Sequence, residues 1–327
     1  MTYHSINGLR YHYTREGFGD PVVLFHGFTG SSANWHGLTE ILNPHYQVIA
    51  VDLPGHGRTD APEVVSQYAM ANVAADLVEL IIRLNASPAH LLGYSMGGRL
   101  ALYMAIQHPH VASALVLESA SPGLAEAIER ERRRDQDDAL ATRIEAEGVS
   151  EFVDYWESLP LFSTLNRLTP DSRDAIRAQR LANTAHGLSN SLRGMGTGVQ
   201  PSLWDRLTEL KVPVLQITGG LDEKFVAINR QMAKRIPTSQ LEIVPNAGHT
   251  VHREQPDEYS RLVLEFLNRI SDSDSQQLPG AEQNDEDQGG QRHLFEPGIQ
   301  ARQILRTADS QSIADQQRDG QQEQVLP

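Results

Sequence analysis

The feature that most constrains this chain is a glycine-flanked serine, Gly93-Tyr94-Ser95-Met96-Gly97, which stands between an apolar run and a helical pattern. The run Ala89–Leu92 before it is typical of a buried strand, and apolar residues follow it at three- and four-residue spacing. A strand that turns into a helix at G-x-S-x-G leaves room only for glycine beside the serine and raises the hydroxyl above the sheet edge. We therefore predict that Ser95 is a catalytic nucleophile.

The segments around this turn repeat the same alternation of strands and helices. Predicted strands are short, apolar and close to glycine, proline or asparagine: Val22–Phe25, Val48–Val51, His90–Gly93, Ala114–Glu118, Val214–Thr218 and Leu241–Val244. Predicted helices carry one apolar face: Asn72–Leu84, Gly97–Gln107, Val226–Ile236 and Pro256–Ile270. This order predicts an α/β fold with a mostly parallel sheet covered by helices on both faces.

Composition divides the chain into three parts. Residues 1–121 and 206–270 hold the strand pattern and form the predicted core. Residues 122–205 carry ten arginines, no lysine and 14 acidic residues between two predicted strands, so we expect an inserted helical cap. Residues 271–327 contain 13 glutamines and one aromatic residue. Such a segment buries too little apolar surface to offset its ordering entropy, so we expect a disordered acidic tail.

An acid and a histidine follow the last two predicted strands. Asp222 comes after Val214–Thr218, and His249 comes after Leu241–Val244. This order of serine, acid and histidine is the one found when a G-x-S-x-G serine works with a triad. We predict that His249 takes the proton of Ser95 and that Asp222 orients the imidazole. The neighbouring candidates, His252 for the base and Glu223 for the acid, fit the strand ends less well.

The loop after the strand Val22–Phe25 is the second predicted part of the site. In such sites the oxyanion is bound by one backbone N–H from this loop and one from the residue after the nucleophile. These would be the amides of Phe28 and Met96. Three further polar residues near strand ends could be mistaken for catalytic groups, and we expect each of them to stabilise its loop: His26, Asp52 and His56.

Charge and composition narrow the partners. The net charge is −14, which argues against nucleic acid or an anionic membrane as a partner. No apolar stretch is long enough to cross a bilayer and no secretory signal is visible, so we expect a cytoplasmic protein without membrane insertion. The chain has no cysteine, and its histidines show no metal-binding spacing, so we expect no metal site. The oligomeric state stays open.

The motifs taken together resemble one family. The relevant residues are the arginine in Gly93-Tyr94-Ser95-Met96-Gly97-Gly98-Arg99, the arginine run after Glu118-Ser119-Ala120-Ser121-Pro122-Gly123-Leu124, Trp156 with Pro160-Leu161-Phe162, the segment Ser191–Pro201 before Leu203-Trp204, and the loops carrying Asp222 and His249. Over about residues 20–270 this resembles the 2-succinyl-6-hydroxy-2,4-cyclohexadiene-1-carboxylate synthases of the α/β-hydrolase superfamily. The glutamine-rich tail falls outside that resemblance.

The resemblance implies a lyase of menaquinone or phylloquinone biosynthesis that acts without a cofactor. It would eliminate pyruvate from 2-succinyl-5-enolpyruvyl-6-hydroxy-3-cyclohexene-1-carboxylate, a small polycarboxylate. A triad on this fold can also catalyse the reaction of a serine esterase or a carbon–carbon bond hydrolase, and this is the alternative hypothesis. A non-catalytic binding module is a third, although such proteins usually lack a triad residue, and none is missing here.

The resemblance also implies which side chains bind the substrate. Arg99 matches the arginine of the serine motif, and Tyr94 and Trp156 match aromatic residues of the pocket. Arg133 and Arg180 fall where the cap arginines of the family lie. The register stays open at both positions, because other arginines lie one to three residues away. Arg132 or Arg134 could take the place of Arg133, and Arg177 could take the place of Arg180.

Overall fold

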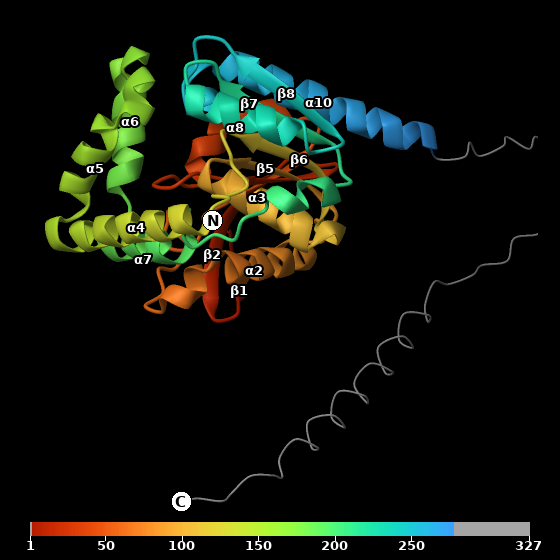
Figure 1. The fold of residues 1–327 in the computed structure, drawn as a ribbon. Helices are drawn as coiled ribbons and strands as arrows, with labels where there is room; N and C mark the ends of the chain where they lie inside the picture. The colour runs from red at the N-terminus through yellow and green to blue at the C-terminus, as the bar shows by residue number, and fades with distance from the viewer. Residues whose placement is uncertain (1, 278–327) are drawn as a thin grey trace, which may run out of the picture. The chain divides into compact units, whose positions relative to one another are not determined.

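The structure is a computed structural model that describes residues 2–277 (Figure 1). Eight strands of the described chain form one sheet in the order β1-β2-β4-β3-β5-β6-β7-β8. All pairs from β4 to β8 are parallel, while β1 and β2 are antiparallel. The strands are β1 (Thr2–Ile6), β2 (Leu9–Glu16), β3 (Pro21–Phe25), β4 (Gln47–Val51), β5 (Ala89–Tyr94), β6 (Ala112–Glu118), β7 (Val214–Gly219) and β8 (Ser239–Val244). The predicted mostly parallel sheet is confirmed.

The two faces of the sheet bury two separate apolar cores. Along β3, Val23 and Phe25 belong to one core, while Val22 and Leu24 belong to the other. This follows from the period-two geometry of a strand, and it explains why a doubly covered strand has an unbroken apolar sequence. The helices outside the insertion cover these faces: α1 (His36–Leu42), α2 (Met70–Arg83), α3 (Met96–Gln107), α8 (Glu223–Ala233), α9 (Val251–Glu254) and α10 (Pro256–Gln277).

Two elements near the N-terminus were not predicted from the sequence. Strand β1 lies at the sheet edge and is mostly polar and exposed, so it carries almost no apolar pattern. Strand β2 does alternate, with Leu9, Tyr11 and Tyr13 buried, but the tyrosines and charged neighbours obscured that signal. Its antiparallel pairing with β4 places it at the edge of the parallel sheet.

Helix α10 is longer than the helix that the sequence predicts. It begins at Pro256, as expected, and continues to Gln277, beyond the predicted end at Ile270. A helix anchored by buried apolar residues extends at small cost because each added residue gains a hydrogen bond without a new nucleation step. The rest of the predicted tail, residues 278–327, lies outside the described residues.

Four helices lie between β6 and β7, beside the sheet in Figure 1. They have a small core of their own, which includes Ile144, Phe152 and Leu188, and Phe28 from the sheet side packs against it. Short 3-10 turns complete the connections. The helices are α4 (Ala127–Glu147), α5 (Val149–Ser158), α6 (Pro170–Leu181) and α7 (Ala185–Met195), and the turns are η1 (Ser32–Trp35), η2 (Val65–Tyr68), η3 (Pro109–Val111), η4 (Pro160–Arg167) and η5 (Trp204–Glu209).

Candidate active site

Ser95 lies in a sharp turn between β5 and α3. Its φ is 49° and its ψ is −105°, a conformation that non-glycine residues rarely adopt. A Cβ at Gly93 would collide with the carbonyl of Gly97, and a Cβ at Gly97 would collide with the carbonyl of Phe25. Backbone hydrogen bonds fix the turn on both sides, since the Ser95 N–H donates to the Glu118 carbonyl at 2.9 Å and the Ser95 carbonyl accepts the Arg99 N–H at 2.9 Å. The two motif glycines are therefore required by close backbone approach.

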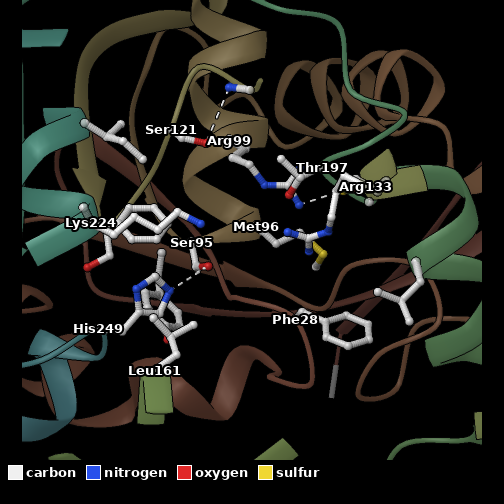
Figure 2. Close-up of a pocket in the computed structure, with 18 of the residues that line it drawn as sticks. Phe28, Ser95, Met96, Arg99, Ser121, Arg133, Leu161, Thr197, Lys224 and His249 are labelled. Atoms are coloured by element: carbon white, nitrogen blue, oxygen red, sulfur yellow. Dashed lines mark hydrogen bonds between the residues drawn. The ribbon is translucent and has the colours of Figure 1, made fainter. Parts of the chain in front are cut away.

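His249 and Asp222 meet Ser95 from the ends of β8 and β7. The Nε2 atom of His249 lies 3.1 Å from Ser95 Oγ (Figure 2). Its Nδ1 atom lies 2.7 Å from Asp222 Oδ2. Both the imidazole and the carboxylate are buried. This places an Nδ1–H donated to the carboxylate and an Nε2 lone pair toward the serine hydroxyl, the arrangement needed to accept a proton. The structure thus brings all three predicted triad residues together.

The acid is held by its own helix and by the neighbouring loop. Asp222 is the N-cap of α8, and its Oδ1 accepts the Phe225 N–H at 3.3 Å. The preceding residue, Leu221, donates its N–H to the Ala247 carbonyl at 2.9 Å, which joins the acid loop to the histidine loop. The second carboxylate oxygen therefore stays available for His249.

Glu254 holds the loop on both sides of His249. Its Oε2 accepts the Gly248 N–H at 2.8 Å, and its Oε1 accepts the Thr250 N–H at 3.1 Å. An ionised carboxylate accepts at both oxygens, so one side chain satisfies the amides on either side of the histidine. Glu254 is a positioning residue, because it contacts the backbone around His249 and lies outside the pocket lining.

We expect Glu254→Gln to lower kcat by about tenfold with little change in KM, since the amide nitrogen faces one of the two N–H donors and lets the imidazole shift. Steady-state kinetics of the triad-dependent reaction would measure this split. Glu258→Gln is the matched control, because Glu258 is exposed and pairs with Arg261 on α10. A rise in KM equal to the fall in kcat would contradict a positioning role.

The polar loop residues set aside as catalytic candidates are buried and form hydrogen bonds within the loops. His26 donates or accepts at both nitrogens, with the Gly27 carbonyl 2.8 Å from Nδ1 and the Leu53 N–H donating to Nε2 at 3.0 Å. Burial lowers the pKa of His26, so the neutral ring joins the β3 and β4 loops. Asp52 accepts the Arg58 N–H at 2.9 Å and contacts His12 at 2.8 Å.

His56, and the alternative base and acid His252 and Glu223, also have contacts away from Ser95. The Nδ1 of His56 bonds the Pro54 carbonyl at 3.1 Å, and burial lowers its pKa to about 3. His252 donates its N–H and Nδ1–H to the buried carboxylate of Glu118 at 3.1 and 2.9 Å. Glu223 is exposed at the first position of α8. These contacts explain why His249 and Asp222, rather than their neighbours, meet Ser95.

A pocket of about 180 Å³ opens above Ser95 and is bounded by the sheet loops and the inserted helices. Aromatic and aliphatic side chains form most of its wall, and cationic groups lie at three points. Its lining includes Phe28, Tyr94, Ser95, Met96, Arg99, Arg133, Trp156, Leu161, Phe162, Thr197, Lys224, Phe225 and His249. Eight of the ten predicted site residues line this pocket, His249 among them, and Asp222 lies behind the histidine.

Arg99 is a buried cation in this pocket. Its guanidinium donates to Gln200 Oε1 at 2.6 Å and to the Met195 carbonyl at 3.0 Å, both neutral acceptors. Among the described residues no carboxylate pairs with it. The pKa of Arg99 is lowered to about 10, mainly by burial and also by the nearby charge of Arg133, while Asp137 acts in the opposite direction. The side chain stays charged at neutral pH, so an anion in the pocket would compensate it.

The structure separates the cap arginines into two groups. Arg133 is half-buried and lines the pocket, where its Nε also donates to Asp137 at 2.7 Å, while Arg132 and Arg134 are exposed. Arg180 instead donates to Glu157 at 3.0 Å and lies over the Phe162 ring. It lines a neighbouring cavity that shares aromatic walls with the first. The predicted contact of Arg180 with substrate stays a prediction.

The predicted aromatic and oxyanion residues lie around Ser95. The hydroxyl of Tyr94 is 3.0 Å from that of Thr250, and Trp156 stacks edge-on to Phe28 with ring centres 5.4 Å apart. Met96 is the first residue of α3, where N–H groups have no partner within the helix. Figure 2 shows Phe28 and Met96 at the same pocket as Ser95. Their oxyanion-binding role stays a prediction.

Sequence reasoning missed Lys224 and Gln200. Lys224 lies two residues after Asp222 and lines the pocket, and Gln200 is buried beside Arg99. The motif around Asp222 contained the lysine, but nothing in it indicated where the side chain points. Within residues 2–277 the structure shows neither a group of potential metal ligands nor a helix long and apolar enough to span a membrane.

Comparisons with known proteins agree with this geometry. A family model described as the alpha/beta hydrolase fold matches residues 20–256. A Bacillus subtilis (strain 168) protein, provisionally named 2-succinyl-6-hydroxy-2,4-cyclohexadiene-1-carboxylate synthase, is 49% identical over 266 residues, covering 81% of this chain and 97% of that protein. The synthase of that name from Enterobacter sp. (strain 638) is 32% identical over 252 residues, covering 77% and 93%.

A solved structure supports the same assignment. MenH from S. aureus is 38% identical and superposes with a TM-score of 0.76, covering 80% of this chain and 98% of that one. The match extends over nearly the whole relative, inserted helices included, and so reaches the part of the fold where hydrolases differ most. The chain therefore has the α/β-hydrolase fold and belongs to the family of 2-succinyl-6-hydroxy-2,4-cyclohexadiene-1-carboxylate synthases.

Proposed function

We propose that this protein is a lyase of menaquinone or phylloquinone biosynthesis. It eliminates pyruvate from 2-succinyl-5-enolpyruvyl-6-hydroxy-3-cyclohexene-1-carboxylate and leaves 2-succinyl-6-hydroxy-2,4-cyclohexadiene-1-carboxylate. The names of its relatives support this reaction. The observation that carries it is Arg99, a buried cation without a carboxylate partner among the described residues, one helical turn from Ser95. A neutral ester would leave that charge uncompensated, whereas a polycarboxylate neutralises it.

The triad starts the reaction by removing a proton from carbon. His249 Nε2 takes the proton of Ser95 Oγ, and the serine oxygen removes the proton next to the succinyl ketone. The C–H electrons move into a new C=C bond, and the carbonyl oxygen becomes an enolate oxygen. Asp222 stabilises the imidazolium that forms. Since Ser95 acts as a base, no acyl-enzyme is needed.

The enolate then drives out the leaving group. Its electrons return through the conjugated ring, and the ring carbon–oxygen bond to the enolpyruvyl group breaks. The released enolpyruvate takes up a proton on carbon and becomes pyruvate. We propose that the backbone amides of Phe28 and Met96 bind the enolate oxygen, and one such donor contributes roughly 3–4 kcal/mol to the transition state. Tyr94 and Trp156 would hold the ring of the substrate.

Pyruvate release tests the function directly. The enzyme is supplied with the enolpyruvyl substrate and pyruvate is measured by coupled lactate dehydrogenase, with nitrophenyl acetate and other simple esters in parallel. The lyase predicts fast pyruvate release and slow ester hydrolysis. Ester turnover well above pyruvate release would favour the esterase or carbon–carbon bond hydrolase that the same triad allows.

Arg99→Met should raise KM for the enolpyruvyl substrate by about 30-fold, because a buried charged hydrogen bond contributes about 1.5–3 kcal/mol. Hydrolysis of nitrophenyl acetate should change little, since that ester carries no carboxylate. The comparison of the two substrates on one variant separates binding from folding. Equal losses on both would remove Arg99 from substrate recognition.

A further inference from the structure

Lys224 brings a cationic side chain to the triad from the opposite side to the arginines. It lies in the first turn of α8, and its side chain lines the same pocket as Ser95 and His249. Its ammonium is 5.8 Å from the centre of the Phe225 ring, which lies 4.6 Å, centre to centre, from the His249 imidazole. Figure 2 shows the side chain extending toward Ser95.

Two features indicate that this charge is placed for a ligand. Within the described part of the chain Lys224 has no carboxylate partner, whereas Arg177, Arg180 and Arg193 on the inserted helices all form ion pairs. The first turn of a helix carries partial positive charge, so a cation there is locally unfavourable. The ammonium lies over the Phe225 ring and the residue is otherwise exposed, so its charge is available to an anion that enters the pocket.

The cations of the pocket therefore form two separate groups. Arg99 from α3 and Arg133 from α4 lie close enough to influence each other electrostatically. In the view of Figure 2 they approach Ser95 from one side and Lys224 approaches it from the other. A ligand with one carboxylate compensates one group only. A ligand with two carboxylates compensates both when its reacting carbon lies between them.

We propose that Lys224 binds a second carboxylate of the substrate, so that the molecule spans Ser95 between the lysine and the Arg99–Arg133 pair. This rests on the proposed function and deepens it, because it makes the site specific for dicarboxylates whose reacting carbon lies between the two acid groups. The ammonium is a compact donor on a flexible stem, which suits a carboxylate that moves as the ring flattens during elimination.

Binding of unreactive probes tests the proposal. The dicarboxylate is 2-(3-carboxypropanoyl)benzoate, and two monoacids each lack one of its carboxylates: 3-benzoylpropanoate and 2-butanoylbenzoate. Titration calorimetry compares wild type with Lys224→Met, Lys224→Arg and Lys234→Met. Lys234 is the matched control, because it is exposed at the opposite end of α8 and outside the pocket.

We expect Lys224→Met to weaken the dicarboxylate and one of the monoacids by about tenfold and to leave the other monoacid within about twofold. Lys224→Arg should retain most of the affinity, and Lys234→Met should behave as wild type. KM for the enolpyruvyl substrate should rise by about tenfold in Lys224→Met, with a smaller change in kcat.

Two results would overturn the role of Lys224: unchanged dicarboxylate binding in Lys224→Met, or equal weakening of both monoacids, which would indicate a general electrostatic effect. The proposed function fails separately, if wild type binds the probes and releases no pyruvate from the enolpyruvyl substrate. The calorimetric comparison then still decides whether Lys224 recognises a carboxylate.

Discussion

Ser95→Ala is expected to reduce pyruvate release by at least about 10⁴-fold, because removing the nucleophile of a triad costs as much as removing the whole triad. In the proposed mechanism the hydroxyl is the group that removes the proton from the substrate, and His249 Nε2 lies 3.1 Å from it as the group that takes up the hydroxyl proton. Alanine has a Cβ as serine does, so the backbone strain at φ 49° is unchanged and the fold should be retained.

Calorimetry on the same variant separates binding from chemistry. The dicarboxylate probe should bind Ser95→Ala within about twofold of wild type, since the cationic groups of the pocket remain. Ser158→Ala serves as a control, because that exposed hydroxyl donates to the Tyr155 carbonyl and lies outside the pocket lining. Pyruvate release by Ser95→Ala at the wild-type rate would show that another group removes the proton.

Asp222→Asn should lower kcat by about 10³–10⁴-fold with the fold intact. The carboxylate accepts the Nδ1–H of His249 at 2.7 Å, while its other oxygen accepts the Phe225 N–H that begins α8. An asparagine can keep the second bond through its carbonyl, but its amide then donates to Nδ1. The imidazole changes tautomer, and Nε2 carries a hydrogen toward Ser95 instead of a lone pair.

Kinetics at neutral pH and thermal unfolding measure this prediction together. The melting temperature should stay close to that of wild type, because asparagine fits the same space and keeps the α8 cap. Glu223→Gln is the neighbouring control, since Glu223 follows Asp222 in the chain and its side chain is exposed. An Asp222→Asn enzyme with more than about a tenth of the wild-type kcat would argue against the orienting role.

Much of the fold could be predicted from local apolar patterns in the sequence. Strands β3 to β7 are buried on both faces and therefore have apolar sequences that can be recognised without any neighbour. Edge strand β1 lacks that burial, and so its sequence carries no comparable signal. The end of α10 at Gln277 could not be predicted for a similar reason. The polar residues that extend this helix have the same composition as the polar segment that follows it.

The triad could be predicted because sheet topology fixes where its residues meet. Ser95, Asp222 and His249 each follow a strand, and the carboxyl ends of parallel strands lie at one edge of the sheet. The sequence thus determined the α/β-hydrolase fold, the three catalytic candidates and the presence of Arg99 one turn beyond the serine.

Only the tertiary structure decided which charged side chains face the pocket. Arg132, Arg133 and Arg134 are consecutive on α4, and their order alone does not reveal which of them turns inward. Arg180 forms an ion pair with Glu157. Lys224 lines the pocket beside the triad and has no carboxylate partner among the described residues. The physical reason is that the direction and pairing of a long side chain depend on packing between elements that are distant in the sequence. Strands and turns, in contrast, can be recognised from residues that are neighbours in the sequence.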